Sequence, residues 1–440
     1  MEINFKNKKI TLMGLGILGR GVNVAKFLAE QGAKLTITDL KTKKELTLSL
    51  KKLKRFRNIK YVLGKHNFND FKNKDLIIKA AGVPLDSPYI TEARKNKIPV
   101  EMDASLFAKL AKDIIFVGVT GTRGKSTVTH LLFEIIKNSK RRVFLGGNIK
   151  GMATLPLLKK IRPGDIVVME LDSWQLQGFG DAKISPHIAI FTTFLPDHLN
   201  YYKGDMKRYF SDKANIYRFQ KKNDWLIMRS AVAKLIKAKS RRIVINKKGT
   251  PSSWQIKLLG KNNIENITLA VKVAEKLGIK KDIIKKTVEN FTGLRGRLEL
   301  VKIINGIRYY NDTTATTPDA VINALESLNN YKGKIVLIGG GADKNLDYSL
   351  YAKKVKKYVK MLILFKGLAT EKILKKLAAV NYESRKIAAN VTSMKMAVEL
   401  AKNFARKGDI VLLSPGAASF GIFKNEFDRG DQFCKIARKI

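Results

Sequence analysis

Short apolar runs alternate with amphipathic stretches along the whole chain. The first strands are predicted at residues 8–14 (KKITLMG) and 35–39 (LTITD), and Gly21–Gln31 between them has helical periodicity. Two further runs, YVLG and DLIIKAAG, alternate with helical segments. Continuous apolar runs of this length are typical of buried parallel strands. The pattern therefore predicts a Rossmann-like α/β domain over residues 1–103.

The alternation resumes at Asp113, where DIIFVGV runs into a glycine-rich loop and a helix that begins near Ser126. Strands RRVFLGG, DIVVMEL and HIAIFTT follow, which predicts a central P-loop ATPase-type parallel sheet over residues 104–294. A turn-rich segment at its end, Gly293–Arg297, is interpreted as a hinge. The later helices of this domain are predicted at Asp205–Phe219, Asn262–Leu277 and Lys281–Glu289.

The C-terminal part opens with a strong hairpin signal, Asn305-Gly306, between two strand-like runs. KIVLIGGG, VKMLILF and DIVLLS are then predicted strands, separated by helical segments. Residues 295–440 are therefore expected to form a third, Rossmann-like domain. The predicted fold class is α/β with three domains.

The strongest chemical signal is GVTGTRGKST, between a predicted strand and a predicted helix. Backbone N–H groups of such a loop, and the amino end of the helix, can surround phosphate oxygens. Lys125 would contact the outer phosphates, and the Ser126 hydroxyl would hold Mg²⁺. A glycine-rich helix cap without a ligand is the plain alternative. The candidate ATP-binding residues in the loop are Gly121, Thr122, Gly124, Lys125, Ser126 and Thr127.

A second glycine-rich turn, Gly14-Leu-Gly16-Ile-Leu-Gly19, directly follows the first strand. Asp39 ends the next strand, at the distance that a dinucleotide-binding fold requires. Taken alone, this arrangement predicts an NAD-dependent dehydrogenase. The phosphate loop later in the chain favours a second interpretation, in which this turn binds a nucleotide other than NAD.

GTRGKST is shorter than the GxxxxGK[ST] loop of many ATPases, and in this form it resembles the loop of the Mur ligase and folylpolyglutamate synthetase superfamily. The resemblance covers the central domain, through Asn148 in GGNI, Glu170 in ELDSWQL, His198 in PDHL and Lys213 in SDKANIY. In the third domain, NDTTAT and SPGAASFGIFKNEFDRGDQF resemble stretches of the D-glutamate-adding Mur ligases. The DNPR stretch expected of diaminopimelate-adding enzymes is absent.

The resemblance implies an ATP-dependent ligase that joins D-glutamate to UDP-N-acetylmuramoyl-L-alanine in peptidoglycan precursor synthesis. Phosphorylation of a carboxylate crowds anionic oxygens, which cations must neutralise. The family uses two Mg²⁺ ions there, and Lys213 would be carbamylated by CO₂. A ligase for another amino acid or acceptor is one alternative, and a non-catalytic P-loop protein that binds nucleic acid is another. The implied metal ligands are Ser126, Glu170, His198 and Lys213, and the implied catalytic residues are Lys125, Glu170, His198 and Lys213.

The same resemblance implies where the substrates bind. The first-domain turn would hold the UDP-linked substrate in place of NAD, and the third domain would hold the amino acid, whose two carboxylates need paired donors once water is excluded. Those amino-acid contacts would come from Thr316, Lys344, Ser419 and the backbone near Phe423. The implied UDP-substrate residues are Gly16, Ile17, Leu18, Gly19, Asp39, Gly82 and Asn148. Further implied contacts to ATP come from Asn263, Arg297 and Asp312.

Three positions depart from the family pattern, and the roles of the missing side chains are not transferred. Thr314 stands where the family has a lysine, whereas Gly296 and Asn262 each stand where it has a histidine. The segment between Trp225 and Leu259 is also brief and lysine-rich. A trimmed edge of the central sheet is therefore expected there.

The charge balance, 85 Lys+Arg against 37 Asp+Glu, gives a formal net charge of +48. Such a charge attracts nucleic acid and anionic lipid non-specifically, but the lysines are scattered along every segment and are expected on solvated faces. We therefore expect no specific nucleic-acid partner and only a weak association with anionic membranes. The single cysteine, Cys434, and the lack of a signal peptide or transmembrane segment favour a cytoplasmic protein, expected to be a monomer.

Overall fold

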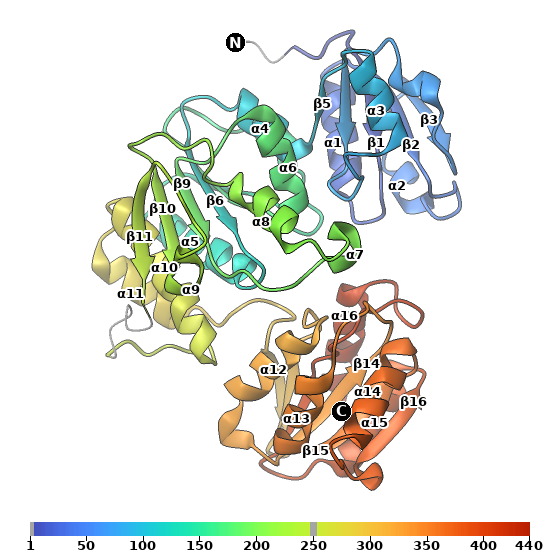
Figure 1. Ribbon diagram of the computed structural model, residues 1–440, viewed down its shortest axis with the longest axis vertical. Coiled ribbons are helices and arrows are strands. Elements are labelled where there is room, and N and C mark those ends of the chain that lie inside the picture. Colours follow the sequence, from blue (N-terminus) through green and yellow to red (C-terminus); the bar gives the residue numbers. More distant parts are fainter. Residues whose placement is uncertain (1–3, 247–252) are drawn as a thin grey trace. The chain divides into compact units, whose positions relative to one another are not determined.

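The computed structural model describes residues 4–246 and 253–440, which form an α/β protein with three sheets flanked by helices (Figure 1). The chain divides into two compact units. The first comprises residues 1–249 and 265–287 and contains two of the sheets. The second comprises residues 250–264 and 288–440 and contains the third sheet. The predicted three-domain α/β class is confirmed, while the boundaries proposed at 103 and 294 stay predictions.

The first sheet is parallel throughout, with the strand order β3-β2-β1-β4-β5. Apolar residues alternate faces along its strands and pack against α1, so that Leu12, Leu35 and Phe27 are buried together. Its strands are β1 (Lys9–Met13), β2 (Lys34–Asp39), β3 (Ile59–Leu63), β4 (Leu76–Lys79) and β5 (Val100–Glu101). Its helices are α1 (Arg20–Glu30), α2 (Thr47–Lys51), the 3₁₀ helix η1 (Phe68–Phe71) and α3 (Pro88–Lys95).

The second sheet is also parallel, with the order β11-β10-β9-β6-β8-β7. Its central strands are buried along their length, as continuous apolar runs in a helix-covered sheet must be. The strands are β6 (Ile115–Thr120), β7 (Val143–Gly147), β8 (Ile166–Glu170), β9 (Ile188–Phe191), β10 (Trp225–Arg229) and β11 (Arg241–Ile245). The helices are α4 (Asp103–Leu110), α5 (Lys125–Asn138), η2 (Leu155–Lys159), α6 (Ser173–Ala182), α7 (Leu199–Tyr202), α8 (Met206–Ala214), α9 (Ser230–Ala233), α10 (Lys261–Lys276) and α11 (Lys281–Asn290).

One hydrophobic core cluster joins the first two sheets, because α1 of the first sheet packs against η2 of the second. Phe27 of α1 and Leu155 of η2 belong to this same cluster, together with Phe107 of α4 and Phe179 of α6. The first two domains are thus continuous in their packing. This continuity places the first glycine loop against the strand ends of the second sheet.

The third sheet has the order β12-β13-β17-β14-β15-β16 and is mixed, since β12 pairs antiparallel with β13 and the others are parallel. Asn305 and Gly306 both have positive φ, as a two-residue hairpin turn requires. The strands are β12 (Glu299–Ile304), β13 (Ile307–Asn311), β14 (Ile335–Gly340), β15 (Val359–Phe365), β16 (Ile387–Val391) and β17 (Ile410–Leu413). The helices are α12 (Pro318–Ser327), η3 (Asn329–Tyr331), α13 (Ser349–Tyr358), α14 (Leu368–Ala378), η4 (Ser384–Lys386), α15 (Met394–Phe404) and α16 (Glu426–Ala437).

Most predicted elements are present, but some differ in length and several short strands were not predicted. The helix predicted at Asp205–Phe219 ends at Ala214, and turns continue the chain. The predicted trimmed edge still carries two strands, β10 and β11, although residues 247–252 lie outside the described part. The strand β16 was missed, because its half-exposed IAANV sequence has no apolar run. Among residues 4–246 and 253–440, no helix has the length and apolar content needed to cross a membrane.

Candidate functional site

The loop between β6 and α5 adopts a conformation that only glycine tolerates at two positions. Gly121 has φ +137°, and a Cβ there would lie 2.0 Å from the Thr192 hydroxyl. Gly124 has φ +88°, and a Cβ there would lie 2.3 Å from Oδ1 of Asn266. Both distances are far below van der Waals contact, so the backbone approaches its neighbours more closely than any side chain would allow. The predicted phosphate loop is therefore a tightly supported turn at the amino end of a helix.

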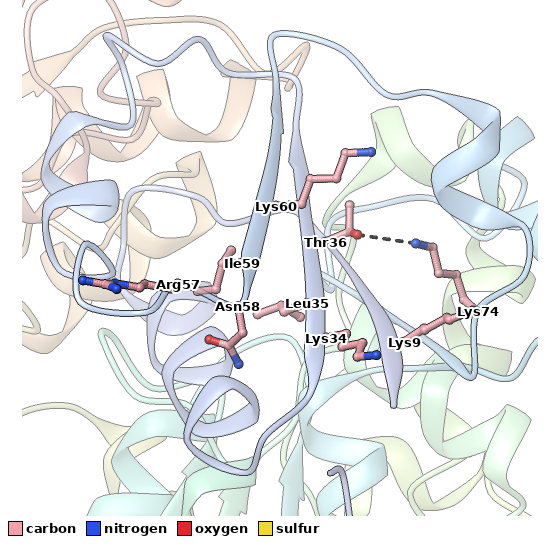
Figure 2. Close-up of a pocket in the computed structure, with 9 residues that line it drawn as sticks. All are labelled: Lys9, Lys34, Leu35, Thr36, Arg57, Asn58, Ile59, Lys60 and Lys74. Atoms are coloured by element: carbon pink, nitrogen blue, oxygen red, sulfur yellow. Dashed lines mark hydrogen bonds between the residues drawn. The ribbon is translucent and has the colours of Figure 1, made fainter. Parts of the chain in front are cut away.

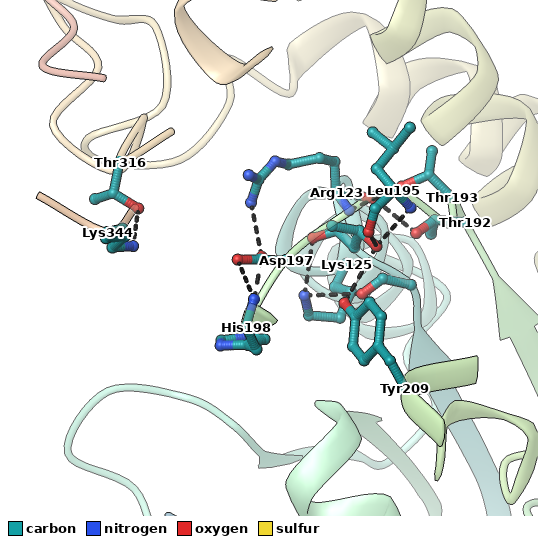
Figure 3. A network of polar contacts seen from close by, with 12 residues as sticks. Arg123, Lys125, Thr192, Thr193, Leu195, Asp197, His198, Tyr209, Thr316 and Lys344 are labelled. Atoms are coloured by element: carbon teal, nitrogen blue, oxygen red, sulfur yellow. Dashed lines mark hydrogen bonds and ion pairs between the residues drawn. The ribbon is translucent and has the colours of Figure 1, made fainter. Parts of the chain in front are cut away.

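Side chains from the segment after β9 hold this loop from outside (Figure 3). The Arg123 N–H donates to Oγ1 of Thr193 at 2.8 Å, and its guanidinium pairs with Asp197 at 3.3 Å. The Thr122 hydroxyl donates to the Leu195 carbonyl at 3.1 Å, and the Leu195 N–H donates back to it at 3.0 Å. The loop is thus positioned before any ligand arrives, which lowers the entropic cost of binding.

Two lysines converge on one carbonyl of this loop. Lys125 Nζ donates to the Gly121 oxygen at 3.1 Å and to the Thr122 oxygen at 3.2 Å. Lys213 of α8, only 2% exposed, donates to the same Gly121 oxygen at 2.9 Å. Burial lowers the pKa of Lys213 well below its ordinary value, and the charge of Lys125 lowers it further. Burial likewise lowers the pKa of Lys125, although the carboxylate of Glu170 opposes that shift.

Glu170 and His198 face these lysines from the carboxyl end of β8 and the start of α7. Glu170 is buried, and its charge interacts with Lys125. His198 has φ +54°, and its ring lies 4.6 Å from the ring of Trp174. Burial lowers the pKa of His198, against the opposing charges of Asp197 and Asp172 and with the help of Lys213 and Lys125. The lowered pKa favours the neutral imidazole that binds metals. The structure therefore gathers Lys125, Glu170, His198 and Lys213 at one sheet edge.

This donor set suits a divalent cation together with a polyphosphate. A buried carboxylate, a neutral imidazole and the hydroxyl of Ser126, itself 9% exposed, offer the ligand types that Mg²⁺ accepts, with oxygen preferred. An unmodified lysine supplies no such ligand. Trp174 is a residue that sequence reasoning missed, although it lies within ELDSWQL: its buried indole N–H has no hydrogen-bond partner among the described residues.

The first-domain glycine loop is held by the aspartate predicted beside it. Asp39 is buried at the end of β2, where Oδ2 accepts the Gly16 N–H and Oδ1 accepts the Lys41 N–H, both at 2.9 Å. Each oxygen of Asp39 already accepts a backbone N–H, whereas a dinucleotide fold would direct this carboxylate to a ribose. Ile17 and Leu18 at the tip of the loop are 51% and 50% exposed. Asp39 therefore supports the loop, and the choice of a UDP-linked substrate over NAD at this loop stays a prediction.

Asn148 connects this loop to the second sheet. Its side-chain oxygen accepts a hydrogen bond from Arg20 at 3.0 Å, and its N–H donates to the Glu170 carbonyl at 2.6 Å. Arg20 also donates to the Gly147 carbonyl at 3.1 Å. Sequence reasoning missed Arg20, because only the packing of the two sheets brings it to Asn148. Gly82, in the loop after β4, has no atoms near its Cβ position.

Lys79 is a second residue near the first-domain site that the sequence did not single out. It is 2% exposed, and its Nζ donates to the Val83 carbonyl at 2.6 Å. Burial lowers the pKa of Lys79 to about 8. The sequence feature that could have pointed to Lys79 is its position at the end of an otherwise apolar strand, since a buried cation there needs a partner.

A buried arginine supports the phosphate loop through an asparagine that contacts the loop. Arg229 donates to Oδ1 of Asn266 at 2.6 Å and pairs with Glu265 at 2.7 Å. Because Asn266 lies against Gly124, the hydrogen bond between Arg229 and Asn266 helps to position the loop. Neither Arg229 nor Asn266 was among the predicted site residues. Asn263, which was predicted to contact ATP, donates its side-chain N–H to the Leu259 carbonyl at 2.7 Å.

In the second unit, Asp312 is buried at the end of β13. Its Oδ2 accepts the Ser414 hydroxyl at 2.8 Å, and its Oδ1 accepts the Leu298 N–H at 3.1 Å. Burial raises the pKa of Asp312 to about 7, and the charge of Arg297 opposes this shift. Asp312 and Arg297, both predicted to contact ATP, thus interact electrostatically. Asp312 does not cap a helix, because it directly follows the last residue of β13 and α12 begins only at Pro318.

The raised pKa of Asp312 gives a testable pH dependence. Between about pH 4 and pH 7 the folded protein holds a proton on Asp312 that the unfolded chain has lost, so stability should fall as pH rises through this window. The change would be on the order of 4 kcal/mol for a shift from 3.8 to about 7. Hydrogen exchange of the β13 and β17 amides, compared between wild type and Asp312→Asn, measures it. Equal slopes in both proteins would contradict this assignment.

The predicted amino-acid residues lie at the carboxyl edge of the third sheet. Lys344 Nζ donates to the Thr316 hydroxyl at 3.0 Å, which brings two of them into direct contact (Figure 3). The Phe423 N–H donates to the Ser419 carbonyl at 3.2 Å, so the other two are also in contact. Both Ser419 and Phe423 are buried. No ligand contact follows from this alone, and the assigned roles stay predictions.

Arg429 organises the loops around these residues and was not among the predicted site residues, although it lies in the recognised motif. It is fully buried, and its Nη2 donates to the Thr313 carbonyl at 2.9 Å. Its Nε donates to the Thr313 hydroxyl and its Nη1 to the Ala417 carbonyl, each at 3.2 Å. Burial lowers the pKa of Arg429 to about 10, which leaves it charged at neutral pH.

The three residues that depart from the family pattern each make local contacts. The Thr314 hydroxyl donates to the Gly296 carbonyl at 3.0 Å, so two of the departures contact each other. Gly296 has φ +75°, and a Cβ there would lie 3.0 Å from Thr313. A histidine at this position would therefore be strained. Asn262 donates from its side chain to Asn323 at 2.9 Å.

Comparison with known proteins agrees with this geometry. Three family models match in order: the N-terminal domain of the MurD-like Mur ligases over residues 8–101, the Mur ligase middle domain over 119–246, and the Mur ligase glutamate ligase domain over 296–416. Together they cover the predicted substrate loop, the phosphate loop and the third sheet.

Full-length relatives extend the match. The UDP-N-acetylmuramoylalanine–D-glutamate ligase of Roseiflexus sp. (strain RS-1) is 36% identical, over 98% of this chain and 99% of that protein. The ligase of the same name from Borreliella afzelii (strain PKo) is 38% identical, over 98% of each chain. The crystal structure of UDP-N-acetylmuramate-alanine ligase from Thermotoga maritima shares the fold, with a TM-score of 0.63 and 19% identity over 98% of this chain and all of that one. The chain belongs to the Mur ligase family.

Proposed function

We propose that this chain is the ligase that adds D-glutamate to UDP-N-acetylmuramoyl-L-alanine, with ATP, in peptidoglycan precursor synthesis. The observation that carries the reaction class is the phosphate loop with Lys125 and Lys213 on one carbonyl, beside buried Glu170 and His198. The choice of D-glutamate is supported by the names of the relatives. The third-domain motifs around Thr316 and Arg429 support it independently.

The proposed reaction has two steps, and this chain's residues position each. First, the alanine carboxylate attacks the γ-phosphorus of ATP, which gives an acyl phosphate and releases ADP. Then the D-glutamate amine attacks the acyl carbon, loses a proton and displaces inorganic phosphate to form the amide. Lys125 and the loop N–H groups stabilise the anionic oxygens of the first step. The Thr316 and Lys344 pair would hold a carboxylate of the incoming amino acid.

Two Mg²⁺ ions, held by Ser126, Glu170, His198 and a carbamylated Lys213, would neutralise the charge that accumulates as the carboxylate is phosphorylated. Carbamylation requires an uncharged amine, which attacks CO₂ at carbon and loses a proton. Lys213 fits this requirement because it is buried beside Lys125. Its modification would replace a cation by a carboxylate-like group and add the oxygen ligand that a bare lysine lacks.

The further assignments concern location and assembly. A cytoplasmic location fits the single Cys434, which is buried and unpaired. We propose that the protein acts as a monomer, without a specific nucleic-acid partner, and that its charge allows only a weak association with anionic membranes. The domain boundaries at residues 103 and 294 belong to this proposal as well.

A panel of radiolabelled amino acids tests the proposed function. With UDP-N-acetylmuramoyl-L-alanine, ATP and Mg²⁺ present, we expect phosphate release and product only with D-glutamate. Turnover with a different amino acid would replace the proposal by another specificity within the family. Salt-sensitive retention on DNA without any substrate-stimulated ATP hydrolysis would favour a non-catalytic nucleic-acid-binding protein instead.

A further inference from the structure

A hollow of about 310 Å³ opens at the amino-terminal edge of the first sheet (Figure 2). Five of its nine lining residues are Lys or Arg, whereas the whole chain has 85 among 440, and its lining includes no acidic residue. Its volume is at the lower end of the range of ligand pockets, about 300–1,000 Å³. The cations are Lys9, Lys34, Arg57, Lys60 and Lys74.

The register of the strands brings these cations together. Lys9 of β1 pairs directly with Lys34 of β2, and Thr36 of β2 pairs with Lys60 of β3. Neighbouring strands lie about 4.8 Å apart, and like charges directly across from each other are destabilising. Figure 2 shows the Lys34 amine on the side of Lys9, whereas the Arg57 guanidinium points away. An anion bound between the lysines would relieve this repulsion.

Nearby carboxylates offset only part of the charge. Lys60 Nζ lies 3.6 Å from Asp70, and Asp75, which accepts the backbone N–H of Lys9 at 2.7 Å, lies beside the start of β1. Lys74 is half-buried, and its Nζ donates to the Thr36 hydroxyl at 3.4 Å. Burial lowers the pKa of Lys74, the charges of Lys60 and Lys9 lower it further, and Asp70 opposes them. The charges of Lys60 and Lys9 thus act on the amine of Lys74.

We propose that this hollow is a second anion site, which binds a small molecule carrying two or more linked phosphate groups. Lys9, Lys34 and Lys74 would contact the phosphate oxygens, and the Thr36 hydroxyl would accept or donate one further hydrogen bond. The site is separate from the proposed substrate loop, because β1 and β2 begin at the hollow and end at Met13 and Asp39, next to that loop. The concave shape suits a free phosphate compound better than a lipid surface that carries the same group.

Lysine footprinting tests the hollow directly, because it reports the modification of each lysine separately. Binding of phosphate at the loop of the second sheet would therefore not be mistaken for binding at the hollow. Acetylation of each lysine is followed by mass spectrometry with and without tripolyphosphate, at matched ionic strength. At about ten times the dissociation constant, nine-tenths occupancy should slow modification of Lys34 and Lys74 roughly tenfold. The exposed Lys51 and Lys54 of the same domain should be unaffected.

A matched pair of double variants completes the test. Lys9→Gln/Lys34→Gln should abolish the protection of Lys74, and Lys51→Gln/Lys54→Gln, with the same change in charge, should preserve it. Equal protection of all these lysines, or protection that survives the first double variant, would overturn the proposal. Protection seen with phosphatidylglycerol vesicles but not with tripolyphosphate would also overturn it, in favour of a membrane contact. The outcome is independent of the amino-acid panel, because it requires no catalysis.

Discussion

Lys213→Ala should lower the rate of D-glutamate ligation by at least about 10²- to 10³-fold, the size of effect expected when one charge-stabilising group is lost. Lys213 is 2% exposed and donates to the Gly121 carbonyl, so its removal takes both a buried group and a contact from the phosphate loop. In the proposed carbamylated form it would also remove a metal ligand. Steady-state kinetics of ADP release measure the loss.

Two comparisons separate this role from a structural one. Lys207→Ala, on the exposed face of the same helix, should keep wild-type activity. A short carboxylic acid such as propionate should partly restore Lys213→Ala, because its carboxylate can replace the carbamate, and it should leave wild type unchanged. Activity of Lys213→Ala within tenfold of wild type would exclude a role for carbamylation in catalysis.

Arg429→Met should destabilise the second unit by about 2–4 kcal/mol and raise the KM for D-glutamate. The substitution leaves the carbonyls of Thr313 and Ala417 buried without their charged donor, and each lost bond of this kind costs about 1–3 kcal/mol. Thr313 precedes the loop that carries Thr316, so the loop should lose its fixed position. Chemical denaturation and amino-acid titration measure the two effects.

The matched control is Arg438→Met, at the exposed end of the same helix, which should change neither quantity by a measurable amount. If Arg429→Met were destabilised while its KM stayed unchanged, Arg429 would support the fold without positioning the amino-acid site. If stability and KM were both unchanged, the buried hydrogen bonds would carry little energy.

Local patterns allowed much of the fold to be predicted. The hairpin at Asn305-Gly306 and the strands β14 and β15 depend on neighbouring residues, since turn chemistry and continuous apolar runs are visible in any short window. The phosphate loop could be located for the same reason. In contrast, β16 was missed because IAANV has no apolar run, so that its strand structure depends on pairing with β15.

The site residues likewise divide into those with a local sequence signal and those whose role depends on the fold. Lys125 and Gly121 belong to one loop, so their contact could be foreseen, and the resemblance placed Glu170, His198 and Lys213 near it. Supporting residues could not be found this way. The partners of Arg20 and Arg229 lie on other elements, and the burial of Lys79, which bonds to nearby Val83, depends on the folded domain. Their sequence signal was weak, namely single cations at the edges of apolar segments.

The shared core of the first two sheets has a practical consequence for dissecting the protein. Phe27 and Leu155 pack in one cluster, and Arg20 hydrogen bonds to carbonyls across the join. A fragment that starts after residue 103 would uncover apolar surface and leave those carbonyls without their donor, so it should aggregate. Proteolytic nicking near that position should yield two pieces that stay associated through gel filtration.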